Sequence, residues 1–287
     1  MMTGNSNRRS TKIEIATSLG LSRSSLYYQP KKPAQDLATK KLIEMALAKH
    51  KSYGHKRIAL ELGMNKKKVR RVMKKFNLKP YRRRVNQPVK AQDINKPIVS
   101  YQNLIKAVVA ERPNQIWVAD FTYLPWQGRF IYVATVMDLF TREVIGYAVS
   151  SKHDRWFCLE ALAMAIIRTN SQPEYHHSDQ GSEYDSEDYL KRLTENKISI
   201  SMSQKASPWE NGFQESFYAQ FKVDLGRPDQ FETLGELTEA IYLQIHYYNH
   251  QRIHTSLKMS PIKFKNQYLK SNNINRKTNP QQLRQSV

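Results

Sequence analysis

Residues 115–125, QIWVADFTYLP, combine β-branched and aromatic residues in the pattern of a buried strand. One carboxylate, Asp120, interrupts this apolar run. An ionised side chain is almost never fully buried without a partner, so Asp120 requires either a cation or a place at an exposed strand end. The stretch therefore predicts a core strand that carries a functional acid.

Two other acidic residues lie in segments that bear on the same site. Asp179 lies in EYHHSDQGSEY, a short predicted strand that runs into a glycine-containing loop. Glu215 lies in SPWENGFQESFYAQFK, a helical pattern, and residues 180–214 separate it from Asp179. Three carboxylates from two strand ends and a helix would form an oxygen-ligand site for Mg²⁺ or Mn²⁺.

These segments, with Lys222 seven residues after Glu215, resemble the DDE core of retroviral integrases. They are still more similar to bacterial insertion-sequence transposases of the IS-three type, in their second-reading-frame product. The likeness runs from about residue 110 to YYNHQRIHTSLKMSP at 247–261, and less specifically over the basic N-terminal part.

The resemblance implies a DNA transposase that binds the terminal inverted repeats of its own element. It implies single-strand cleavage at the 3′ end and transfer of that end, through a circular intermediate. Asp120, Asp179 and Glu215 are then the catalytic residues and the metal ligands. Two Mg²⁺ ions, with Mn²⁺ as a substitute, would clamp an in-line phosphodiester displacement, and Asp120 would lie between them.

The resemblance also implies partners. These are double-stranded DNA, as element ends and as target, and at least one further copy of the chain. Such products often act as a fusion with an upstream reading frame that supplies a leucine zipper. No heptad zipper occurs in this sequence, so an upstream-frame partner is a further expectation.

Length and composition restrict the class of protein. A chain of 287 residues favours two domains over one. No run of 18 apolar residues occurs, and the first thirty residues lack an apolar segment, so we expect neither a membrane span nor a signal peptide. The single cysteine, Cys158, excludes an internal disulfide and a cysteine-based zinc site. We expect a cytoplasmic, nucleoid-associated bacterial protein.

Charge is distributed unevenly along the chain. Residues 1–112 hold 27 Lys and Arg against 6 Asp and Glu, whereas residues 113–287 hold 19 of each. The whole net charge of +21 therefore belongs to the first part. This asymmetry predicts a basic DNA-binding arm joined to a near-neutral catalytic body, with a merely soluble basic domain as the alternative.

The first part contains a predicted helix-turn-helix at 11–30. Ala16, Gly20 and Leu26 have the spacing of its small residue, its turn glycine and its packing residue. Such a unit places its second helix in the major groove of DNA. A helical hairpin without DNA contact is the alternative. The residues that this helix would present to DNA are Arg23, Ser24 and Ser25.

A second helix-turn-helix is predicted at 36–80. Ala59, Gly63 and Val69 repeat the earlier spacing 43 residues later, and Asn65 can cap the last helix. That helix has one apolar stripe, and cations cover its remaining surface. Because seven cations repel one another, we expect DNA phosphate beside them rather than a merely solvated face. The cations are Lys66, Lys67, Lys68, Arg70, Arg71, Lys74 and Lys75.

Three further segments carry little core-forming sequence. Residues 81–112 are predicted to be a basic, proline-containing linker, in which Arg82, Arg83 and Arg84 follow a DNA backbone. Residues 1–10 are polar and residues 271–287 are rich in Asn and Gln. Both ends are therefore predicted to be disordered.

Residues 113–270 are predicted to form an α/β domain. Strands within 115–125, 130–139 and 143–150 are joined by short turns, which predicts an antiparallel meander. Helices and strands alternate after it, in the order seen in RNase H-like folds. We therefore expect a mixed five-stranded sheet flanked by helices, as an integrase core, preceded by an all-α helix-turn-helix region. The later elements are predicted at 155–169, 175–178, 186–196, 198–202, 209–225 and 234–248.

Three residues near Glu215 or in the last matched motif are predicted to support DNA binding. Lys222 lies almost two helical turns after Glu215, so we expect it to hold the DNA end, unless it is a solvated lysine or a partner of Asp224. Asn211 lies one turn before Glu215 and is predicted to touch DNA or to support the site. Arg252 is predicted to pack and to contact a DNA phosphate.

Other polar residues compete for the metal site. Asp138 is expected in a turn, and the acids that follow Asp179 are expected to begin a helix. A metal site at His176 and His177 is disfavoured, because strand alternation directs them to opposite faces.

Two other classes of function remain open. One is a DNA-binding regulator without catalytic activity, which would have no need of three metal-binding carboxylates. The other is an RNase H-like structure-specific nuclease, which would need little sequence readout from helix-turn-helix units.

Overall fold

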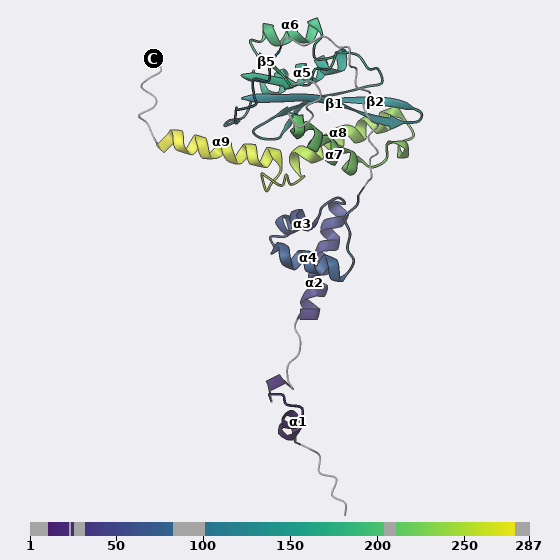
Figure 1. Ribbon diagram of the computed structural model, residues 1–287, viewed down its shortest axis with the longest axis vertical. Coiled ribbons are helices and arrows are strands. Elements are labelled where there is room, and N and C mark those ends of the chain that lie inside the picture. The colour runs from purple at the N-terminus through teal and green to yellow at the C-terminus, as the bar shows by residue number, and fades with distance from the viewer. Residues whose placement is uncertain (1–10, 23, 26–31, 83–100, 204–210, 279–287) are drawn as a thin grey trace, which may run out of the picture.

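The computed structural model describes residues 11–22, 24–25, 32–82, 101–203 and 211–278 (Figure 1). The predictions for Arg23, Arg83 and Arg84, and for segments 1–10 and 279–287, lie outside the described residues.

The second part of the chain contains a mixed five-stranded sheet, as predicted. Its strands lie in the order β3-β2-β1-β4-β5. The pairs β1–β2 and β2–β3 are antiparallel, whereas β1–β4 and β4–β5 are parallel. The strands are β1 (Ile116–Trp126), β2 (Arg129–Asp138), β3 (Val144–Ser150), β4 (Tyr175–Ser178) and β5 (Ser199–Met202).

Helices cover both faces of this sheet (Figure 1). Because side chains alternate along a strand, Trp117 and Ala119 of β1 pack with α5 (Trp156–Thr169) and α6 (Glu187–Glu195). Ile116 and Val118 pack on the other face, where α7 and α8 contribute the aromatic and aliphatic partners. Helix α7 is Gly212–Leu225, a short 3₁₀ turn (η3) follows at Pro228–Gln230, and α8 is Leu234–His250. The result is three layers around two apolar cores.

The first part of the chain is helical. Helix α1 (Lys12–Ser18) begins with a capping box made by Thr11 and Glu14. Gly20 and Gly63, the two predicted turn glycines, both adopt positive φ, of 65° and 60°. Ser24 and Ser25 form one helical turn, and the rest of the predicted second helix of that unit lies outside the described residues.

Helices α2 (Lys32–Lys49), α3 (His55–Glu61) and α4 (Lys66–Lys75) form one unit, which we call the α2–α4 unit. The predicted apolar stripe of α4 is confirmed, since Val69, Val72 and Met73 are buried in the core of the unit. Asn65 caps α4 as predicted, because its side chain accepts a hydrogen bond from the amide of Lys67.

The α2–α4 unit is attached to the sheet domain through the end of α8 and the segment after it. Tyr53 accepts a 2.6 Å hydrogen bond from the amide of Ile253, and Nε of Arg57 donates to the carbonyl of Ile253. Nδ1 of His50 lies 2.7 Å from the hydroxyl of Tyr247. Ile253 itself packs into the core of the unit. We call these contacts the joint.

Part of the predicted linker packs against the sheet domain instead of running free. The amide of Met202 donates to the carbonyl of Gln102, and the amide of Leu104 donates to Ser201. Ile105 and Val108 contact the core below β1. The prediction of a linker up to residue 112 is therefore wrong for 101–112, because scattered apolar residues find partners there.

The prediction of disorder from residue 271 is also wrong for its first part. Helix α9 runs through Pro261–Thr278. Phe264 and Tyr268 pack on Phe140, and Lys265 lies 2.9 Å from Glu143. These contacts come from distant parts of the chain, so the polar local composition gave no sign of them. Among the described helices, none is long and apolar enough to cross a membrane.

The packing of β3 on α5 depends on Gly146. A Cβ at this position would lie 2.0 Å from the carbonyl oxygen of Ala161 and 2.8 Å from the Cβ of Ala165. We predict that Gly146→Ala lowers the free energy of unfolding by about 1–3 kcal/mol or more, because backbone and helix must separate. Urea unfolding of the full chain measures this. Gly235→Ala, in a helical position with only the Thr233 hydroxyl within 4 Å, is the control. Equal unfolding midpoints for the two variants would contradict the prediction.

Candidate active site and nucleic-acid interface

The parallel pairing of β1 and β4 sets two of the predicted acids at matching positions. Val118 pairs with His177, so the same register carried on by two residues brings Asp120 opposite Asp179. Side chains two residues apart share a face, so Asp120 lies on the same side of the sheet as Val118, the α7 side. Asp179 is the first residue after β4. The pairing therefore sets Asp120, which lies within β1, near the end of the neighbouring strand, where Asp179 follows.

Each of these acids also orders its own backbone. Oδ1 of Asp120 accepts a hydrogen bond from the amide of Phe121 at 2.8 Å. Oδ1 of Asp179 accepts one from the amide of Gly181 at 3.0 Å, which forms a tight turn. A Cβ on Gly181 would lie 2.9 Å from the carboxylate of Glu183 and 3.0 Å from that of Asp179, so a larger residue here would displace these side chains.

Helix α7 is held on β1 by polar side chains at successive turns. Asn211, Gln214 and Tyr218 donate hydrogen bonds to the backbone carbonyls of β1 at 118–120. The bonds of Gln214 and Tyr218 measure 2.7 and 2.6 Å. Glu215 lies between these anchors and is exposed. The helix therefore holds Glu215 beside the part of β1 that carries the first acid.

Lys222 lies further along the same pair of elements. Its Nζ is 5.3 Å from the ring centre of Tyr123 in β1. Helix α7 thus runs in the direction of β1, with Gln214 at the start of the contact and Lys222 near its end. Glu215 and Lys222 belong to one stripe of the helix, as predicted from their spacing.

The carboxylates of Asp120, Asp179 and Glu215 are of the type that binds hard divalent cations. Carboxylate oxygens are the ligands that Mg²⁺ and Mn²⁺ prefer, and all three acids lie along β1 or next to it. Across the described residues, no three His, Cys, Asp or Glu side chains are gathered closely enough to hold a metal ion. This finding includes Asp120, Asp179 and Glu215 as they lie here, so they are candidate ligands by residue type and by their positions on β1, after β4 and on α7.

Comparisons with known proteins show the family of the chain. Two models of the integrase core domain match residues 110–208 and 196–261. A putative transposase of insertion sequence element IS150 from Escherichia coli is 33% identical over 276 residues, which cover 88% of this chain and 93% of that protein. The chain belongs to the insertion-sequence transposases with an integrase core.

Other relatives have the same character. A 31 kDa protein of insertion element IS600 from Shigella sonnei is 31% identical and covers 87% of this chain and 96% of its own length. The transposase of IS904 from Lactococcus lactis is 35% identical over 55% of this chain and 64% of its own length. Among solved structures, the magnesium-bound catalytic core of HTLV-2 integrase matches 54% of this chain and 97% of its own, at 18% identity and a TM-score of 0.46.

The two histidines of the transposase before Asp179 have structural partners. Nε2 of His176 lies 3.0 Å from the hydroxyl of Tyr189 in α6, and burial lowers the pKa of His176 to about 3. Nδ1 of His177 lies 2.9 Å from Ser201 in β5. The two rings therefore serve packing on separate sides of β4, consistent with the alternation that disfavoured a metal site there.

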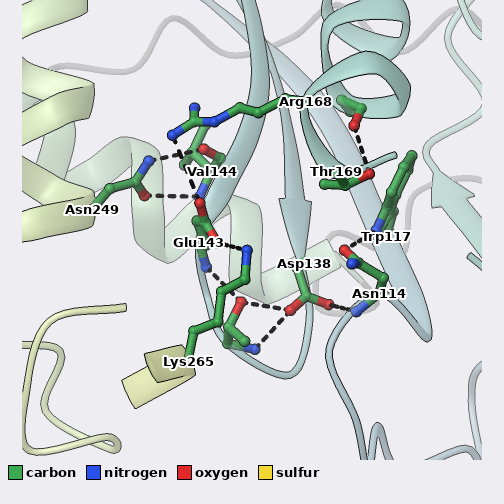
Figure 2. A network of polar contacts seen from close by, with 11 residues as sticks. Asn114, Trp117, Asp138, Glu143, Val144, Arg168, Thr169, Asn249 and Lys265 are labelled. Carbon is green, nitrogen blue, oxygen red and sulfur yellow. Dashed lines mark hydrogen bonds and ion pairs between the residues drawn. The ribbon is translucent and has the colours of Figure 1, made fainter. Parts of the chain in front are cut away.

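Asp138, which was expected in a turn, is instead the last residue of β2, and its carboxylate binds the polar turn that follows (Figure 2). Its carboxylate accepts hydrogen bonds from the amides of Asn114 and Thr141, and burial raises its pKa. Glu143, in the same network, contacts Lys265 of α9. These acids hold the turn and the last helix in place.

Two residues predicted to contact DNA are buried instead. Arg252 is 2% exposed, with its Nε 2.5 Å from the carboxylate of Asp224 and a further hydrogen bond to Gln220. Asn211 is 5% exposed and anchors α7. The predicted packing role of Arg252 and the supporting role of Asn211 are consistent with these positions, and DNA contact by either side chain stays a prediction.

The basic surface of α4 divides into two groups. Arg71 and Lys75 pair with the carboxylate of Asp36 in α2, at 2.6 and 2.9 Å. The local sequence shows no anion near these cations, because Asp36 lies 35 residues before Arg71. The other cations of α4 are exposed: Lys66, Lys67, Lys68, Arg70 and Lys74.

Two smaller groups of predicted DNA contacts have local partners. Nη1 of Arg82 donates to the carbonyl of Ser52, which fixes the end of the α2–α4 unit. Ser24 and Ser25 share hydrogen bonds with the hydroxyl of Ser22. All three remain exposed.

The ion pairs of Asp36 make the stability of the α2–α4 unit dependent on pH. Hydrogen bonds from Arg71 and then Lys75 hold the pKa of Asp36 well below its usual value of 3.8. The folded state thus favours the ionised form. This stabilisation is complete above the unfolded-state pKa and is lost as the pH falls below it.

We predict that Asp36→Asn lowers the melting temperature of the full chain near neutral pH. The difference from the natural chain should narrow as the pH falls below 3.8, the usual pKa of this group. Thermal unfolding at several pH values measures both. Glu44→Gln, which removes an exposed acid paired with Lys40 on the same helix, is the control and should have little effect. A difference that does not change with pH would contradict the assignment.

Proposed function

We propose that this transposase binds the terminal inverted repeats of its insertion sequence and catalyses 3′-end cleavage and strand transfer. The observation that carries the proposal is that three acids lie on β1 or at elements bonded to it. Asp120 lies in β1, Asp179 directly follows β4, which pairs with β1 in parallel, and Glu215 lies on a helix bonded to the same stretch of β1. Family membership supports the same class of reaction.

In this proposal Asp120, Asp179 and Glu215 hold two Mg²⁺ ions, for which Mn²⁺ can substitute. Bound there, the ions supply an activated oxygen nucleophile and stabilise the leaving oxygen of the phosphodiester. The chain contributes the positions of the ligands. Glu215 is exposed, so a DNA strand can reach it, while the anchors on either side of it keep α7 from moving along β1.

The basic N-terminal part supplies most of the DNA binding in this proposal. The exposed cations of α4 form a continuous basic surface without a carboxylate on that helix. In a helix-turn-helix this last helix enters the major groove. Lys222 would contact the DNA end near Glu215, as a compact cation suited to phosphate.

The assembly is proposed on the same basis. Two helix-turn-helix units at 11–30 and 36–80 recognise the element end, and the core within 113–270 cleaves it. A second copy of the chain binds the other end, and the product of an upstream frame contributes further contacts. The relatives are transposases of elements with two ends, which supports an assembly of at least two chains.

We predict that Asp120→Asn, Asp179→Asn and Glu215→Gln each abolish cleavage and strand transfer in Mg²⁺. Each variant removes a charged ligand, while the basic units that bind DNA are unchanged. Gel shifts and strand-transfer assays on one end-containing duplex measure the two properties together. Asp185→Asn, an exposed acid just after the Asp179 loop, is the matched control and should retain activity.

The same assay separates the alternative functions. Activity in any one of the three variants would reject that residue as a ligand. A natural chain that binds ends without cleaving or joining them would be a regulator. Cleavage with no preference for the element end would indicate a structure-specific nuclease.

We also predict that the double variant Lys67→Gln, Arg70→Gln weakens binding to all DNA and makes its salt dependence shallower. Because each cation neutralises one phosphate, removing both should reduce the log–log salt slope by about 2. Fluorescence anisotropy over a series of salt concentrations measures the slope. Lys191→Gln, Arg192→Gln removes the same charge from an exposed part of α6 and should leave the slope unchanged. Equal slopes for the two double variants would remove α4 from the DNA interface.

A further inference from the structure

A small cavity lies where the joint meets the active-site helix. It measures about 160 Å³, and its walls come from α7, the turn after β2, segment 252–256 and α3. Phe213, Ser216 and Gln220 form the α7 wall. These residues are three or four positions apart and share one face of α7, whereas the helical period directs Glu215 to another side of the same helix.

The walls of this cavity carry positive charge and no negative charge. Arg57, Arg142 and Arg252 line it together with His254, and none of the lining residues is acidic. The charge of Arg252 is matched by Asp224, which lies outside the lining. The hydrogen bonds of Arg57 go to neutral oxygens of Ile253 and Gln220. Such a lining repels cations and attracts an anion.

Two nitrogen atoms in this wall lack partners. Nη1 of Arg142 and Nδ1 of His254 are shielded from solvent, and no hydrogen-bond partner for either lies among the described residues. A buried donor without an acceptor is costly, so such groups in native proteins usually mark a missing ligand, ion or water. Guanidinium groups have only donors, so the missing partner of Arg142 is an acceptor.

The guanidinium of Arg142 is fixed in position. It lies 3.9 Å from the ring centre of Phe213 in α7. Its backbone has φ of 63°, and its amide donates to the carbonyl of Asp138 at the end of β2. The polar turn of Asp138 therefore presents this cation to the cavity. Burial, together with the three arginines, lowers the pKa of His254 to about 4, so its ring is neutral near pH 7 and does not add to the repulsion.

We propose that this cavity binds one phosphate group of a DNA strand, which rests on the proposed function as a transposase. A phosphodiester offers two charged oxygens that only accept hydrogen bonds, and it matches a wall of donors. The exposed hydroxyls of Thr255 and Ser256 at the cavity can donate to the same group. The cavity volume of about 160 Å³ leaves room for a phosphate and bridging water.

The position of the cavity gives this phosphate a second role. Arg57 belongs to α3 of the α2–α4 unit, whereas Arg142, Arg252 and His254 belong to the sheet domain. One phosphate therefore contacts both parts of the chain. Occupation of the cavity by the strand thus tightens the joint.

The test compares Arg142→Gln with Arg129→Gln in the full chain. Arg129 stacks on Trp126 at the opposite end of β2, so its variant removes the same charge far from the cavity. Anisotropy with a duplex carrying the element end should show about tenfold weaker binding for Arg142→Gln, the loss of one charge-assisted contact. The log–log salt slope should fall by about 1. Arg129→Gln should match the natural chain.

Neutral methylphosphonate linkages, placed one at a time along the strand, identify the phosphate. At one position the linkage should weaken binding by the natural chain and by Arg142→Lys, but not further weaken binding by Arg142→Gln. If every linkage affects Arg142→Gln as it affects the natural chain, the cavity does not bind DNA and the proposal is overturned. Melting curves of the variants confirm that all of them fold.

A third arm uses inorganic phosphate against chloride at equal ionic strength. One outcome is that phosphate stabilises the natural chain against unfolding but not Arg142→Gln, while the variant keeps the salt slope of DNA binding of the natural chain. This result would mean a site for free phosphate and would overturn the DNA assignment. If the proposed transposase function itself were wrong, the result would differ from both of these outcomes. The natural chain would then show no preference for the element end and would not join it to target DNA.

Discussion

The hydrogen bonds from α7 into the backbone of β1 hold the candidate active site together. Gln214 is fully buried, and Thr135, directly opposite Asp120 in the ladder, bonds to both Gln214 and Tyr218. Apolar contacts alone would allow a helix to shift along a strand at small cost, whereas short directional bonds specify one position. Without these anchors, neither Glu215 nor the wall of the phosphate cavity would have a defined relation to Asp120.

Much of the fold could be predicted because its signals are local. The meander follows from three apolar runs rich in β-branched and aromatic residues and from short turns such as that at Gln127 and Gly128, both of which adopt positive φ. The strand Tyr175–Ser178 was predicted with its observed bounds. The ends of α5, α6, α7 and α8 lie within three residues of their predicted positions. Asn65 and the stripe of α4 were predictable for the same reason, since a cap and a helical period lie within a few residues.

The remaining features depend on partners that are distant in the chain. Asp36 pairs with Arg71, and Asp224 pairs with Arg252. The local sequence around each arginine does not reveal its partner, because the partner lies far away in the chain. Phe140 orders α9 across more than a hundred residues. The residue types of the candidate active site come from the sequence, whereas the parallel pairing of β1 with β4 does not, because a parallel ladder leaves no mark in either strand alone.

The joint has a consequence for the DNA that the transposase would accept. Hydrogen bonds at His50, Tyr53 and Arg57 keep the α2–α4 unit at a set offset from the sheet domain. Under the proposed function, this fixed offset sets two properties of the DNA between the recognised bases and the scissile bond. One is the number of base pairs, and the other is the rotation about the duplex axis. B-DNA completes a turn in about 10–10.5 base pairs, so a shift of half a turn between the recognised bases and the element end turns the scissile strand to the far side. The short polar contacts of the joint thus restrict the spacing between the recognition sequence and the end of the mobile element.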